Sequence, residues 1–91
     1  MKPLLRTVVL EDANRLITVE RAKEHGDAHE NFQVIADYWS TCLGIKIRPA
    51  QVCDCMELLK LARRKSNPRN IENSRDGAGY AALSYELDND T

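Results

Sequence analysis

The sequence predicts an all-α fold, a compact bundle of about four helices, and three observations support this prediction. Apolar residues recur every three or four positions in several segments. Charged residues make up 30% of the 91 residues and aromatic residues only 5%, a balance typical of helical proteins rather than β-sandwiches. Gly26, Gly44 and Pro68 interrupt the chain between these segments. We therefore expect a single helical domain over residues 1–91, small enough to gain stability from dimerisation.

The first helix is expected from Leu4 to His25. β-branched residues around Thr18 lower the helix propensity, so we expect a kink or a break there. Gly26 can end the helix in a left-handed conformation. This helix is also a candidate for part of a dimer contact. Its apolar stripe comprises Leu5, Val8, Val9, Ala13, Leu16, Ile17 and Ala22.

The second helix shows the clearest boundaries. Asp27 can cap its N-terminus, with Glu30 at the capping-box spacing, and Gly44 can end it. One face of this helix is apolar, formed by Phe32, Ile35, Ala36, Trp39 and Leu43.

The third helix is expected to begin at Pro49, because proline suits the first turn of a helix. It should stop at Asn67, since the residue before Pro68 is disfavoured in the helical region. The residues expected to face the core are Val52, Cys55, Met56, Leu59 and Ala62.

The fourth helix is expected to begin near Asn70. Gly77 and Gly79 each cost about 1 kcal/mol relative to alanine in a helix interior, and Asp76-Gly77 is an alternative turn. We favour a continuous helix in which the glycines allow another helix to approach closely. The polar residues 88–91 are expected to form a frayed tail. The apolar positions are Ile71, Ala78, Ala81, Ala82, Tyr85 and Leu87.

Charge and cysteine content restrict the classes of function. The formal net charge of −1 gives no general attraction to polyanions or to a membrane surface, and no segment resembles a membrane span. Cys53 and Cys55 would point about 200° apart on a helix, which is unsuited to one metal ion, so we expect reduced thiols in the cytoplasm. Gly26 lies between His25 and His29, which are therefore expected to cap or pack rather than to bind zinc.

A candidate site lies where the third and fourth helices meet. Glu72 and Asp76 are four residues apart, so both carboxylates can face one way. Lys60 and Arg63 can face them from the third helix. Carboxylates that hold magnesium, with cations that hold phosphate, are the groups a nucleotide-hydrolysing site needs. The alternative is a set of surface salt bridges that contribute well under about 1 kcal/mol each.

Cations are concentrated around the same corner. Arg64, Arg69 and Arg75 join Lys60 and Arg63 as candidate phosphate-binding or partner-binding residues, with Lys65 between them. Such a corner can contact a nucleic acid backbone. The fourth helix is rich in alanine and glycine, which read bases poorly, so we treat a nucleic-acid-binding regulator as the weakest of the functional hypotheses.

Several short motifs carry a resemblance to a known family. They are residues 21–27, 30–32, 39–40, 43–44, 58–63, 67–68 and 79–83, with Pro49 and Val52. In this order along the chain they resemble a family of small phage and prophage proteins of unknown function. The resemblance implies a distant similarity to all-α MazG-like nucleoside triphosphate pyrophosphohydrolases, which bind magnesium through helix-borne carboxylates and act as oligomers. This chain lacks their paired-glutamate motif, and it has Ser74, Arg75 and Gly77 where the family usually has an aromatic or aliphatic residue.

Two hypotheses of different class follow. The favoured one is a non-catalytic phage accessory protein, a homodimer in the host cytoplasm, that binds a host protein such as a defence component. The other is a magnesium-dependent nucleotide pyrophosphohydrolase or nucleotide binder that uses Glu72 and Asp76 for the metal. The residues leave open whether the protein is an enzyme, and they imply no cofactor beyond the magnesium of the second hypothesis.

Overall fold

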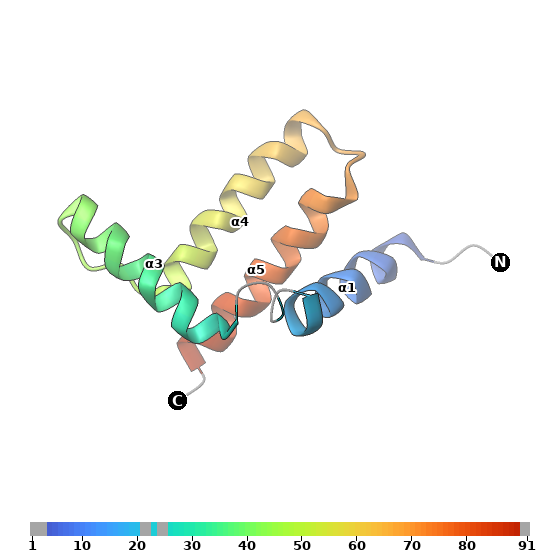
Figure 1. Ribbon diagram of the computed structural model, residues 1–91. Helices are drawn as coiled ribbons and strands as arrows, with labels where there is room; N and C mark the ends of the chain where they lie inside the picture. Colours follow the sequence, from blue (N-terminus) through green and yellow to red (C-terminus); the bar gives the residue numbers. More distant parts are fainter. Residues whose placement is uncertain (1–3, 21–22, 24–25, 90–91) are drawn as a thin grey trace.

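The computed structural model describes residues 4–20, 23 and 26–89. These form helix α1 (Leu5–Arg15), the π-helical segment η1 (Leu16–Glu20), α3 (Ala28–Leu43), α4 (Pro49–Ser66) and α5 (Ile71–Asn89). Helices α4 and α5 form an antiparallel hairpin, α3 crosses one end of it, and α1 packs on α5 (Figure 1). The predicted all-α fold is confirmed. None of the helices in the described ranges combines the length and apolar character needed to cross a bilayer.

The N-terminal segment is irregular where the sequence predicted it. The α-helix ends at Arg15, and a π-helical turn follows that includes Thr18. The Thr18 hydroxyl donates a hydrogen bond to the Asn14 carbonyl oxygen at 2.6 Å, as β-hydroxyl residues do when they compete with the helix. Leu5 was expected in the apolar stripe but is exposed. Ala22 and His25 lie outside the described residues.

The ends of α3 and α4 follow local sequence rules. Asp27 caps α3, although its carboxylate accepts from the N–H of His29 at 3.0 Å rather than from Glu30. Gly26 and Gly44 have φ of 75° and 71°, the left-handed conformation that glycine adopts most readily.

The predicted boundaries of α4 are confirmed. Pro49 is its first residue and Ser66 its last, directly before Asn67-Pro68. At its start, the Arg48 N–H donates to the Gln51 side-chain oxygen at 2.8 Å.

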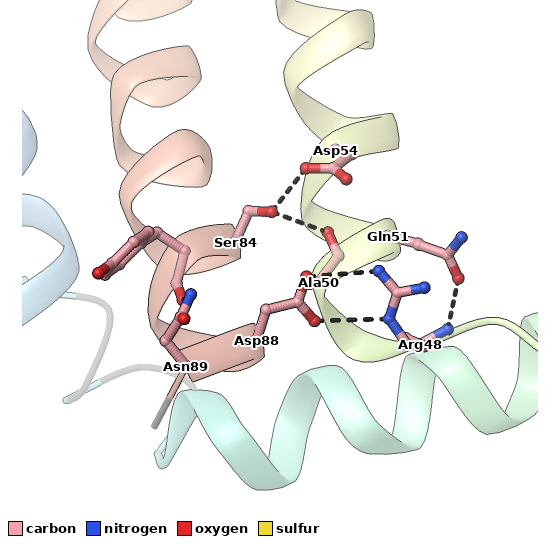
Figure 2. A network of polar contacts seen from close by, with 8 residues as sticks. Arg48, Ala50, Gln51, Asp54, Ser84, Asp88 and Asn89 are labelled. Atoms are coloured by element: carbon pink, nitrogen blue, oxygen red, sulfur yellow. Dashed lines mark hydrogen bonds and ion pairs between the residues drawn. The ribbon is translucent and has the colours of Figure 1, made fainter. Parts of the chain in front are cut away.

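A polar network fastens the start of α4 to the end of α5 (Figure 2). The Arg48 guanidinium donates to both Asp88 carboxylate oxygens at 3.4 and 3.3 Å. The Ser84 hydroxyl lies 2.6 Å from Asp54 Oδ1 and 3.3 Å from the Ala50 carbonyl oxygen. Helix α5 includes Asp88 and Asn89, two residues that were expected in the frayed tail. Residues 90–91 lie outside the described part of the chain.

The buried core is centred on α3 and α4. Cys53 is fully buried, and burial, together with the nearby Asp54 carboxylate, raises the pKa of its thiol to about 12. All three cysteines are free, and Cys42 and Cys55 are exposed. The fully or nearly fully buried cluster is Phe32, Ala36, Val52 and Cys53.

Several residues predicted to face the core do not. The inward face of α4 contains Val52, Cys53 and Met56. Cys53 is therefore buried where the sequence predicted that Cys55 would be. The inward face of α5 carries Asn73 and Asp76, polar residues that an apolar pattern assigns to solvent. The predicted core residues that are instead exposed are Leu43, Cys55, Leu59, Ala62, Ile71, Ala81, Ala82 and Tyr85.

The glycine pair in α5 lies inside a continuous helix, as predicted. A Cβ at Gly79 would lie 2.9 Å from Ile17 Cγ2, so a side chain there would collide with η1. A Cβ at Gly77 would lie 3.8 Å from the Cβ of Lys60, an ordinary contact. Gly79 therefore allows the close approach of the N-terminal segment, whereas Gly77 does not need to be glycine.

We expect Gly79→Ala to lower the free energy of unfolding. The collision with the β-branched Ile17 costs about 1–3 kcal/mol, which offsets or exceeds the roughly 1 kcal/mol gain in helix propensity. Gly77→Ala, its matched control, should instead raise that free energy by about 0.5–1 kcal/mol. Urea denaturation of both variants measures the difference, and equal stabilisation by the two substitutions would contradict the close approach.

Candidate functional site

An open pocket of about 360 Å³ lies where η1, α3, α4 and α5 meet. Helices α4 and α5 contribute residues three or four positions apart, because that spacing keeps side chains on one face. The lining is mostly apolar. It consists of Leu16, Ile17, Gly26, Asp27, Ala28, Asn31, Phe32, Ile35, Trp39, Val52, Met56, Asp76, Tyr80 and Leu83.

Aromatic rings form much of this pocket. The rings of Phe32 and Tyr80 meet edge to face, with centroids 6.4 Å apart and planes at 82°. Trp39 and Ile35 pack beside them against the buried core. The geometry suits an apolar or aromatic group as occupant.

Asp76 is the buried carboxylate of this region, only 6% exposed. Its Oδ2 lies 2.9 Å from Lys60 Nζ, and its Oδ1 lies 3.0 Å from Arg75 Nε. Burial disfavours the charged form, but the hydrogen bonds and charges of Lys60 and Arg75 outweigh it, so the pKa of Asp76 is held below its ordinary value. Each carboxylate oxygen is therefore already bound by a cation.

The comparisons with known proteins identify the family. Residues 8–88 match a domain of unknown function, DUF6378. The chain belongs to this family. It is also 41% identical over 73 residues to the Gene 55 protein of Mycobacterium phage D29, across 80% of this chain and 48% of that protein. The corresponding protein of Mycobacterium phage L5 is 37% identical over 76 residues, across 82% of this chain and 49% of that protein.

The matches cover most of this chain but only part of its relatives. The chain spans about half the length of these curated relatives. The DUF6378 match includes every residue of the pocket and the Lys60–Asp76 pair. The predicted resemblance to a phage family of unknown function is confirmed, whereas the MazG-like similarity stays a prediction. No solved structure matches the chain.

The structure brings together some of the predicted site residues and separates others. Lys60 and Asp76 meet across the two helices, as predicted, and Arg75 joins them. Glu72 is exposed in the first turn of α5, with its N–H bound to the Asn70 side chain at 3.0 Å. The cations Arg63, Arg64 and Arg69 are exposed around the α4–α5 corner.

The fit of a magnesium ion can be tested against this geometry. Within the described residues, no group of three or more His, Cys, Asp and Glu side chains is placed to hold a metal ion. Asp76 could serve as a ligand only if Lys60 or Arg75 released its oxygens. The pair Glu72 and Asp76 does not fit a metal centre in this arrangement.

The pocket itself was not predicted from the sequence. Its residues come from η1, the loop before α3, and helices α3, α4 and α5. A hollow between helices depends on how their axes cross. The signal present in the sequence is the spacing of Asp76, Tyr80 and Leu83, which places these three residues on one face of α5. The predicted apolar face, which includes Ala78, Ala81 and Ala82, is a different one.

We expect Asp76→Asn to lower the free energy of unfolding by about 3 kcal/mol at neutral pH, since it leaves two cations without their buried partner. Because the folded-state pKa is depressed, the contribution of Asp76 is present above the unfolded pKa and is lost as the pH falls through the folded pKa. The difference between wild type and variant should therefore shrink below about pH 4.

Glu72→Gln is the matched control, because it removes an exposed carboxylate one turn earlier on α5 and should change stability by less than about 0.5 kcal/mol. Urea unfolding across a pH series measures both variants. A wild type and an Asp76→Asn variant that differ by the same amount at every pH would contradict the depressed pKa.

Proposed function

We propose that this protein is a small, non-catalytic accessory protein of phage type that binds a host protein in the cytoplasm of the infected cell. The pocket at the meeting point of η1, α3, α4 and α5 would receive an apolar side chain of that partner. The observation that carries the proposal is this open pocket with its aromatic walls. A host defence component is one class of target that this role suits.

Apolar pockets of this kind support protein binding for a physical reason. A few anchoring side chains that enter desolvated pockets supply most of the energy of an interface. Phe32, Trp39 and Tyr80 offer rings for such an anchor, while Asp27 and Asn31 add polar groups. The pocket combines an apolar lining with a few polar groups, as binding sites usually do.

The state of Asp76 supports a non-catalytic role. A general base needs a free lone pair and a pKa near the working pH. Both Asp76 oxygens are bound by cations, and its pKa lies below its ordinary value. The buried carboxylate therefore acts as a structural anion beside the pocket.

Filling the pocket tests this proposal. We expect Ala28→Phe, in the first turn of α3, to place a ring in the pocket and to reduce the recovery of a specific partner at least about tenfold. Ala81→Phe is the matched control, because it adds the same ring to an exposed position on α5. Both variants would be used as baits in extracts of mycobacterial cells, the hosts of the two phage relatives, after circular dichroism confirms folding.

The proposal fails if the wild type enriches no protein above the Ala28→Phe bait, or if Ala81→Phe loses the same partner. The first result would leave the pocket without a protein ligand. The second would show that the loss does not depend on the pocket.

A nucleotide binder is the second candidate, because Asp76 lies among the aromatic residues that line the pocket. We expect calorimetry with nucleoside triphosphates, with and without magnesium, to give no heat and no released pyrophosphate. Magnesium-dependent binding that disappears in Glu72→Ala and Asp76→Ala would instead establish the nucleotide function. The weaker hypothesis of a nucleic-acid-binding regulator rests only on the exposed cations of the α4–α5 corner.

A further inference from the structure

A second hollow is lined by residues of α1, α4 and α5 and by none of α3. It is a groove of about 740 Å³ between α1 and α4, with Gly77 and Ala78 of α5 in its lining. Leu10 from α1 and Leu58 and Leu61 from α4 line it, and they are 63%, 64% and 50% exposed. Large aliphatic side chains at such exposure indicate an interface.

The α4 wall of the groove carries a regular pattern. Asp54, Leu58 and Leu61 line the groove, and Lys65 follows one turn later on the same face of α4. These four residues, the α4 stripe, are spaced four, three and four positions apart, the spacing of a coiled-coil seam. Leu58 and Leu61 occupy its centre, with an acid at the N-terminal end and a base at the C-terminal end. Leu58, Leu61 and Lys65 also share a shallower hollow with Pro68.

Two further charged residues flank this stripe, an acidic one toward its N-terminal end and a basic one toward its C-terminal end. Glu57 lies beside Asp54, and Arg64 lies beside Lys65. Glu57, Arg64 and Lys65 form no ion pair with any residue in 4–20, 23 and 26–89. Asp54 is held in place by the Ser84 hydroxyl at 2.6 Å through one oxygen (Figure 2).

This pattern is complementary to itself when one copy is reversed. About a two-fold axis between Leu58 and Leu61, Leu58 meets Leu61 of the second copy, and Asp54 meets Lys65 of the second copy. Glu57 then faces Arg64 of the second copy across the flank. A parallel pairing would bring like charges together at both ends, so the charges favour the antiparallel arrangement.

We propose that two copies of this chain pair through α4, antiparallel, with the Leu58–Leu61 centre closed at each end by Asp54–Lys65 and Glu57–Arg64 pairs between copies. The partner that binds the α4 side of the groove is therefore a second copy of this chain rather than a different protein. The pairing surface is separate from the pocket proposed to bind a host protein, so the two proposals can fail independently.

A charge-reversal experiment tests the pairing by sedimentation velocity over a range of protein concentrations. We expect the wild type to form a dimer. The acidic variant Arg64→Glu/Lys65→Glu should raise the dissociation constant at least about tenfold, because every end of the stripe is then negative. The basic variant Asp54→Lys/Glu57→Lys should be weakened in the same way.

An equimolar mixture of the acidic and basic variants should recover a dimer that neither forms alone. The matched control is Arg63→Glu/Arg69→Glu, which makes the same change of charge at the same corner but off the stripe, and which should remain dimeric. Circular dichroism confirms that each variant is folded. A monomeric wild type, an acidic variant that dimerises unchanged, or a control that dissociates as readily would each overturn the proposal.

Discussion

The buried ion pair between Lys60 and Asp76 is the constraint on which the arrangement of this protein depends. A carboxylate taken out of water is costly unless charged donors surround it. Lys60 and Arg75 supply those donors, one from each helix of the α4–α5 hairpin. The pair therefore fixes how α4 lies against α5, and it separates the two hollows, since Asp76 lines the pocket and Lys60 lines the groove.

Small residues on α5 complete this arrangement. Gly79 brings η1 close to the helix, and Ile17 of η1 then forms part of the pocket. A chain with few large buried side chains therefore leaves both the pocket and the groove open.

The sequence predicted those features that depend on one residue and its immediate backbone. Gly44 ends α3 and Pro49 begins α4 because the φ values these residues allow act locally. The faces of α4 and α5 were predicted less well. Asn73 and Asp76 are buried because cations and helices from elsewhere in the chain meet them, and apolar periodicity contains no signal for such partners. The contact of Lys60 with Asp76 could be predicted, but the pocket beside it could not.

A double-mutant cycle on Lys60 and Asp76 tests this account most directly. Urea unfolding at neutral pH would be measured for Lys60→Met, Asp76→Asn and the double variant. If the ion pair fixes the hairpin, the double variant loses less stability than the sum of the two single variants, by about 1.5 kcal/mol or more. Losses that add to within about 0.3 kcal/mol would show that the two side chains act independently, and would contradict the central role of the pair.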